Sequence, residues 1–149
     1  VTADISYPDD QVMAMVYAAE SDASTSTDGG ALGDIIVSDS EVSSVSAKNL
    51  VVLGGSCINT AARQLVDSSA SSTICGADFT AKTDVGAGQF LIQSFDSPWS
   101  SGKVALLVAG YNAEDTTNAV NYLKGQKPDT AAGKKYVGTS ATSATLVTS

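Results

Sequence analysis

The sequence contains no histidine, and its 149 residues include only two cysteines, three prolines and one tryptophan. Without histidine, the chain lacks the commonest general base and the commonest metal ligand of enzyme sites. The remaining residues do not form a complete catalytic constellation at any recognisable spacing. We therefore predict a protein without catalytic activity.

Long apolar runs are also missing. A transmembrane helix needs about 20 consecutive apolar residues, and no run in this chain approaches that length. We therefore expect no membrane insertion. Surface polarity comes largely from serine and threonine, because only 16% of the residues are charged.

Basic residues are scarce, with 8 Lys and Arg against 16 Asp and Glu, so the net charge is −8. Such a charge argues against nucleic acid and against anionic membranes as partners. All eight basic residues lie after position 47, whereas nine of the acids lie before it. We predict that the acidic and basic ends are complementary and join copies of the chain head to tail. The candidate assembly residues are Asp4, Asp9, Asp10, Lys124, Lys127, Lys134 and Lys135.

The clearest structural signal lies in residues 103–125. Val104 to Ala109 is a short, wholly apolar run, typical of a strand that is covered on both faces. After Gly110, Asn112 is placed to cap a helix whose first turn contains Asp115. Apolar residues then recur at three- and four-residue spacing, and Gly125 is placed to stop the helix.

An earlier stretch repeats this pattern. Asn49 to Leu53 is apolar and β-branched, and a glycine pair follows it. Either Ser56 or Asn59 can cap the next helix. Its expected apolar side consists of Ile58, Ala61, Ala62, Leu65 and Val66. Two strand–glycine–helix units predict an α/β fold: a small three-layer arrangement with at least two parallel central strands and two main helices.

Further strands are expected on either side of these units, within one domain spanning residues 1–149. In the N-terminal part we expect strands at Thr2–Ser6, Val12–Ala18, Asp34–Val37 and Val42–Val45, with a helix over 9–20 as the alternative to the second. In the C-terminal part we expect strands at Phe90–Phe95 and Ala144–Thr148. Loops are expected at Ser21–Gly33, Asp67–Thr73, Lys82–Gly88, Ser97–Gly102 and 126–135.

Cys57 and Cys75 are 18 residues apart and flank the first expected helix. A disulfide between them would tie the helix start to the segment after it, and would imply an oxidising compartment outside the cytoplasm. The alternative is a reactive thiolate activated by the helix N-terminus. Because no histidine is present to act as a base, we favour the disulfide.

Two glycine turns could bind a small ligand, because phosphates often bind between a strand and a helix. The turn after residue 53 lacks the third glycine of a dinucleotide fingerprint and the Gly-Lys-Ser/Thr of a P-loop, so a plain tight turn is the competing interpretation. The candidate ligand-binding residues are Gly54, Gly55, Ser56, Asn59, Gly110 and Asn112.

The acidic residues allow two further interpretations. Asp34, Asp39 and Glu41, or Asp22 and Asp28, could supply oxygen ligands to calcium, although their spacing is not that of an EF-hand. No other cofactor is indicated. Glu114 and Asp115 could form a hydrolytic carboxylate pair, but helix capping already explains both.

The two strand–helix stretches, NLVVLGGSCINTAARQLV and KVALLVAGYNAEDTTNAVNYLKG, together resemble archaeal surface-layer (S-layer) proteins of methanogens and related archaea. The family pattern LVxVGGPxxN is matched by Leu50, Val51, Gly54, Gly55 and Asn59, with Ser56 in place of proline. The family pattern xxxLLVAGxxxxDTxxAxxYL is matched by Leu106, Leu107, Val108, Ala109, Gly110, Asp115, Thr116, Ala119, Tyr122 and Leu123. The resemblance covers about residues 48–125.

This resemblance implies a structural, non-enzymatic protein of the archaeal cell surface that forms an extracellular layer, tube or filament. Its partner would be itself, as a homopolymer, with other cell-envelope components as further candidates. An end strand at Thr2–Ser6 or Ala144–Thr148 could extend a neighbour's sheet. The alternative function is a secreted module that binds a nucleotide or a sugar in the crevice beyond Gly55 and Gly110.

Overall fold

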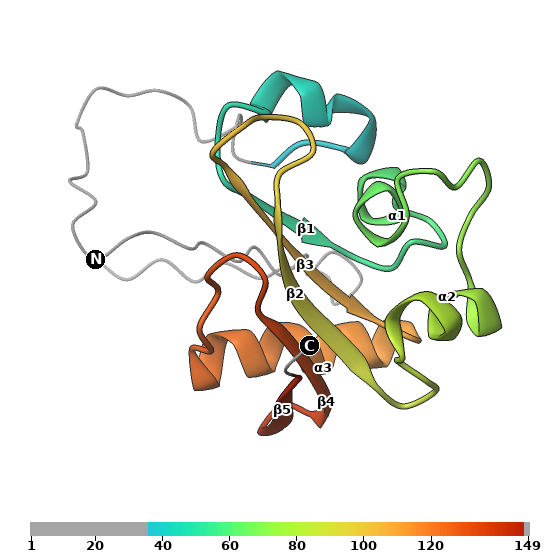
Figure 1. Ribbon diagram of the computed structural model, residues 1–149. Coiled ribbons are helices and arrows are strands. Elements are labelled where there is room, and N and C mark those ends of the chain that lie inside the picture. Colours follow the sequence, from blue (N-terminus) through green and yellow to red (C-terminus); the bar gives the residue numbers. More distant parts are fainter. Residues whose placement is uncertain (1–35, 148–149) are drawn as a thin grey trace, which may run out of the picture. The chain divides into compact units, whose positions relative to one another are not determined.

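The computed structural model describes residues 36–147. They form a five-stranded sheet with helices on both faces, as Figure 1 shows. The helices are the 3₁₀ helix η3 (Asp39–Val45), α1 (Thr60–Val66), α2 (Gly76–Thr83) and α3 (Ala113–Gln126). The strands are β1 (Leu50–Leu53), β2 (Phe90–Asp96), β3 (Val104–Gly110), β4 (Lys135–Ser140) and β5 (Ser143–Val147).

The strand order is β1-β3-β2-β4-β5. β1 and β3 are parallel, which confirms the expected pairing of the two strand–helix units. The pairs β3–β2, β2–β4 and β4–β5 are antiparallel, so the sheet is mixed. β3 is central, and β1 lies at one end of the described sheet, where β3 is its only described neighbour.

The sheet separates two apolar clusters, and this confirms the three-layer α/β arrangement. On one face, α1 and α2 pack on β1, β3 and β2 through residues such as Ala62, Phe79 and Leu107. On the other face, α3 packs through Ala119 and Tyr122. Every residue of β3 from 105 to 110 is buried between these layers, as its wholly apolar sequence predicts.

The start of α3 follows its sequence closely. Asn112 and Asp115 form a capping box, and the Asp115 carboxylate accepts the backbone N–H of Asn112 at 3.0 Å. The expected stop at Gly125 was wrong, because the helix continues to Gln126. Lys127, with φ 47°, supplies the left-handed residue that glycine usually provides at this position.

The start of α1 is set by Asn59 and not by Ser56. The Asn59 side chain accepts the N–H of Ala62 at 2.9 Å and donates to the carbonyl of Leu53 at 2.9 Å. Ile58 was wrongly expected on the buried side of this helix. It precedes the cap and is 85% exposed.

Several local expectations are corrected by the structure. Ile36 and Val37 do not belong to a strand, and residues 42–45 belong to η3. α2 was not foreseen, and its last two residues fall in the stretch that was expected to be loop from Lys82. β4 was missed, whereas β2 and β5 lie where strands were expected.

The strands expected at Thr2–Ser6 and Val12–Ala18, the helix alternative over 9–20 and the loop at Ser21–Gly33 lie outside the described residues. The single-domain organisation therefore stays a prediction. Within residues 36–147, no helix combines the length and the apolar character that crossing a bilayer requires.

Candidate functional site

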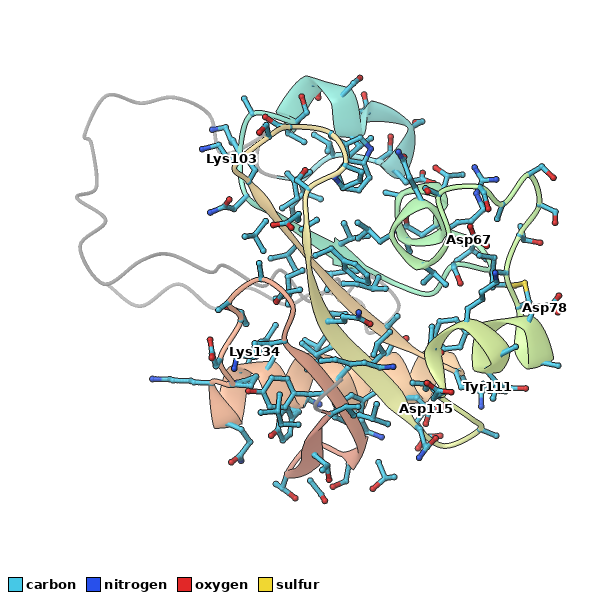
Figure 2. All side chains as sticks on the ribbon, in the orientation of Figure 1. Asp67, Asp78, Lys103, Tyr111, Asp115 and Lys134 are labelled. Atoms are coloured by element: carbon cyan, nitrogen blue, oxygen red, sulfur yellow. A yellow bond between two sulfur atoms is a disulfide. The ribbon has the colours of Figure 1, made fainter. Side chains whose placement is uncertain are left out.

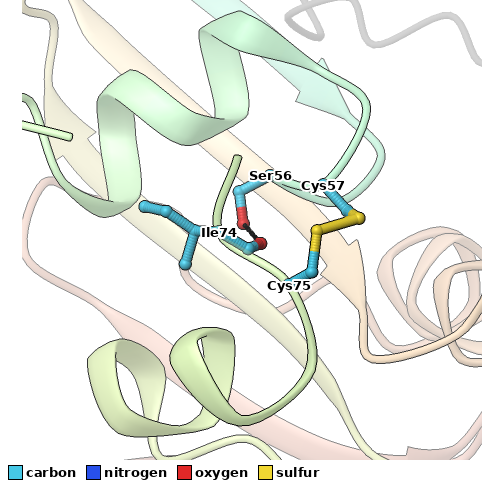
Figure 3. The surroundings of a disulfide bond; sticks show 4 residues. All are labelled: Ser56, Cys57, Ile74 and Cys75. Atoms are coloured by element: carbon cyan, nitrogen blue, oxygen red, sulfur yellow. Dashed lines mark hydrogen bonds between the residues drawn. A yellow bond between two sulfur atoms is a disulfide. The ribbon is translucent and has the colours of Figure 1, made fainter. Parts of the chain in front are cut away.

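Cys57 and Cys75 form a disulfide, which confirms the expected pairing. Beside it, the buried hydroxyl of Ser56 donates to the carbonyl of Ile74 at 2.8 Å (Figure 3). The N–H of Ile74 donates back to the carbonyl of Ser56 at 3.3 Å. The connection between β1 and α1 is thus joined to the start of α2 by one covalent bond and two hydrogen bonds.

The glycines at the carboxyl ends of β1 and β3 differ in how closely their surroundings pack. A Cβ on Gly55 would lie 3.5 Å from the carbonyl oxygen of Gly110. A Cβ on Gly110 would collide with the backbone of Asp115 and Thr116 in the first turns of α3. Gly110 therefore has a structural reason to be glycine without a ligand, whereas the distance at Gly55 is an ordinary contact that a Cβ could make.

A shallow cavity of about 290 Å³ lies beside the disulfide. Of the six candidate ligand-binding residues, only Ser56 and Asn59 line it. Arg63 also lines it, and its Nη1 donates to the carbonyl of Ala70 at 2.7 Å. The Arg63 Nε is buried and has no hydrogen-bond partner among the described residues.

The candidate calcium ligands are engaged with their own chain. Asp39 Oδ2 accepts both the N–H and the hydroxyl of Thr60 at 2.7 Å, and these bonds lower the pKa of Asp39. Glu41 accepts the hydroxyl and the N–H of Ser38, which lowers its pKa as well. Asp22, Asp28 and Asp34 lie outside the described residues. No group of three acidic, histidine or cysteine side chains suited to a metal occurs within residues 36–147.

The candidate assembly lysines divide into two pairs. Lys134 lies 3.6 Å from Asp129, and Lys135 lies 3.7 Å from Asp84, so both form ion pairs within the chain. Lys124 and Lys127 are exposed and form no ion pair with any described residue. Their acidic counterparts Asp4, Asp9 and Asp10 lie outside the described residues.

The two acidic residues at the start of α3 differ in their exposure to solvent. Asp115 is buried and caps the helix, whereas Glu114 is exposed to solvent. Asp115 and Lys134 lie toward opposite ends of α3 (Figure 2). Capping accounts for the position of Asp115.

The outermost strands form a surface feature that the sequence indicated only in part. On β5, Leu146 and Val147 are each 40% exposed. On β1, Val51 and Leu53 are 46% and 42% exposed. The strand at β5 was expected, but the position of β1 at the end of the described sheet was missed, because an apolar run gives no sign of whether one or two strands flank it.

Three of these exposed residues, Val51, Leu53 and Leu146, share a face of the sheet, whereas Val147 follows Leu146 directly and lies on the other face. Val51 and Leu53 are opposite Leu106 and Val108, which belong to the cluster under α3. Leu146 is opposite Tyr136, which packs against the same cluster. α3 covers the middle strands and leaves apolar side chains uncovered on both flanks.

Comparison of the chain with protein-family models, with curated proteins and with solved structures gives no match. The structural observations that bear on function are therefore the sheet edges, the disulfide and the cavity described above.

Proposed function

We propose that this chain is a structural subunit of an extracellular layer, tube or filament on an archaeal cell surface, and that it assembles with copies of itself. The resemblance to S-layer proteins supports the class of function. The two stretches that carry this resemblance correspond to β1 with α1 and to β3 with α3.

The open edge at β5 is the observation that carries the proposal. Among the described residues, β5 pairs only with β4, so one side of its backbone is left for another strand. Such an edge is a template for pairing with a second chain. β5 carries no charged residue that would oppose this, and its exposed Leu146 and Val147 offer apolar contacts.

Propagation requires two different surfaces on each subunit. If β5 of one copy pairs with the opposite side of the next copy's sheet, the contact is heterologous and repeats without closing, unless its rotation forms a ring. Lys124 and Lys127, which are exposed and form no ion pair within residues 36–147, are available to meet the acidic N-terminal part of a neighbour. Such charge pairs set orientation and association rate more than affinity.

The disulfide supports an extracellular location. Disulfides persist in oxidising compartments and are rare in the cytosol of most organisms. The bond joins Cys57 to Cys75 across a sequence separation of 18 and so restricts the unfolded chain.

The proposal is tested by sedimentation and electron microscopy of the full chain, with and without divalent cations. We expect the wild type to form large assemblies at high concentration, and Leu146→Lys to remain a folded monomer. Ile58→Lys is the matched control, because Ile58 is exposed but lies outside the sheet. A wild type that stays monomeric under every condition would overturn the proposal.

The second candidate function is a binding module for a nucleotide or a sugar. The observation in its favour is the cavity beside the disulfide, which is lined by the cationic side chain of Arg63 together with polar residues. Titration with nucleotides and sugars, followed by calorimetry, tests it. Saturable binding that is lost in Arg63→Gln would favour this function over assembly.

A further inference from the structure

The two sulfurs of the disulfide have different surroundings. Cys57 is exposed and lines the shallow cavity beside the disulfide, whereas Cys75 is half-buried and does not line it. Thiol–disulfide exchange proceeds by attack of a thiolate on one sulfur, and the other sulfur is the leaving group. A thiolate that enters through the cavity therefore reaches Cys57 and not Cys75.

The cavity has the size and the lining to admit a small thiol. Its volume of about 290 Å³ is far larger than the ~10–15 Å³ that a single water molecule needs. Among the described residues that line it, Arg63 is the only charged one, and its guanidinium attracts an incoming thiolate. The hydroxyl groups of Ser71, Ser72 and Thr73 also lie in the lining and can donate hydrogen bonds to the rest of the thiol compound.

The place of Cys75 in the fold makes it the better leaving group. Cys75 is the N-cap residue of α2, and its side chain makes no capping hydrogen bond. The N–H groups and the positive dipole end of a helix N-terminus stabilise a thiolate there, although Asp78 in the first turn offsets part of this effect. Because a more stable thiolate leaves faster, the helix and the cavity favour the same direction of exchange.

We propose that Cys57 is a modification site for small thiols, which open the disulfide through the cavity. The thiolate forms a bond to Sγ of Cys57, the bond between the two Sγ atoms breaks, and its electron pair leaves with Cys75 as a thiolate. A second thiol molecule can attack the mixed disulfide, which releases the oxidised thiol dimer and the thiolate of Cys57. The two thiol molecules are thus the reductant. In the reverse step, the Cys75 thiolate attacks Cys57, restores the disulfide and releases the thiol.

The surroundings of the disulfide favour this reverse step. Ser56 and Ile74, which precede the two cysteines, are joined by hydrogen bonds of 2.8 and 3.3 Å, and the Ser56 side chain is buried. These bonds do not require the disulfide, so they keep the two sulfurs close together after it opens. We therefore expect the modification to be reversible when the thiol is removed. The inference does not rest on the proposed function, because it concerns one bond within one chain.

The test treats the native full chain with reduced glutathione. Free thiols are blocked with N-ethylmaleimide at intervals, and the adducts are located by mass spectrometry of peptides. We expect glutathione on Cys57 with N-ethylmaleimide on Cys75, in at least about tenfold excess over the reverse arrangement.

Two substitutions in the same loop test the route of attack. Ser72→Phe places an aromatic ring in the lining of the cavity and should slow the opening of the disulfide by glutathione at least about tenfold, because exchange depends on access to the sulfur. Ser68→Phe is the matched control, because Ser68 is exposed in the same loop but does not line the cavity. It should leave the rate unchanged.

Three results would overturn the inference. Glutathione found mainly on Cys75 would assign the attack to the other sulfur. Equal rates of opening in Ser72→Phe and Ser68→Phe would exclude the cavity as the route. A disulfide that glutathione opens only in denaturing urea would show that the folded chain shields both sulfurs.

Discussion

The side-chain oxygen of Thr116 accepts a hydrogen bond from the backbone N–H of Gly110 at 2.9 Å. This bond joins the last residue of β3 to the first turns of α3. The turn between β3 and α3 is therefore tight. The first turns of α3 lie so close to Gly110 that a Cβ at position 110 has no room.

We expect Gly110→Ala to destabilise the protein by about 1–3 kcal/mol, the range for overpacking a filled interior. The added methyl group must displace the backbone of α3, which cannot move aside as the end of a flexible side chain could. Gly125→Ala is the matched control, because it lies in the same helix with open space around it. It should stabilise the protein by about 0.5–1 kcal/mol. Urea unfolding followed by circular dichroism measures both, and equal effects of the two substitutions would contradict the packing argument.

The disulfide should be a large single contribution to stability. Replacing Cys57 and Cys75 together by alanine should lower the free energy of unfolding by roughly 3 kcal/mol, as the chain-entropy model gives for a loop of this size. Chemical denaturation of the variant against the wild type measures this. Intact mass after alkylation without reductant provides the control, and two freely alkylated thiols in the native protein would contradict the disulfide.

The ion pair between Asp67 and Lys82, 2.8 Å apart, should make stability depend on acid pH. Lys82 and then Ser69 hold the pKa of Asp67 well below its usual range by hydrogen bonding to the carboxylate. Because the pKa is lower in the folded state, the stabilisation is present above the unfolded pKa of about 3.9 and is lost as pH falls below it.

Asp67→Asn should therefore melt at a slightly lower temperature than the wild type at pH 7, and the difference should shrink below pH 4. The effect is small because Lys82 is half exposed. Asp96→Asn, an exposed acid outside any described ion pair, is the control for the change in net charge. A difference that stays constant between pH 7 and pH 2 would exclude this linkage.

The bonds from Thr60 to Asp39 should hold η3 against α1. We expect Asp39→Ala to speed hydrogen exchange in residues 39–45 without changing β3. Glu41→Ala is the control, because the Glu41 carboxylate accepts hydrogen bonds from Ser38 at the start of η3 and none from α1 within the described residues. Equal exchange in the two variants would show that the contact with α1 contributes nothing to the order of η3.

The parts of the fold that were predictable are those in which several local signals agree. For β3 and α3, an apolar run, a glycine turn, a cap at Asn112 and an acid at Asp115 all indicate the same boundaries. α2 was missed because Cys75 makes no side-chain cap and only Phe79 and Thr83 are buried, so its periodicity is weak. η3 was mistaken for a strand because Val42 and Val45 are β-branched, although their three-residue spacing also fits a 3₁₀ turn.

Within the candidate site, the sequence predicted the disulfide correctly, because this bond depends on covalent chemistry and on where the two cysteines lie along the chain. The pairing of Cys57 with Cys75 follows from there being two cysteines around one helix. The position of β1 at the end of the described sheet does not follow from its own sequence, because it depends on where the other strands pair. β2 and β4 lie on the opposite side of β3 from β1. The exposure of Val51 and Leu53 is a consequence of that strand order, which depends on contacts between distant residues.

The strand order also sets which contacts are hard to form when the chain folds. β2 and β3 pair across the short turn 97–103, and β4 and β5 pair across residues 141–142, so their loops close quickly. β1 pairs Leu50 with Ala105, and these residues are far apart along the chain. Because contacts between residues far apart in the sequence slow folding, we expect the two hairpins to form first and β1 to pair with β3 late. Until then, the apolar LVVL sequence of β1 remains exposed to solvent.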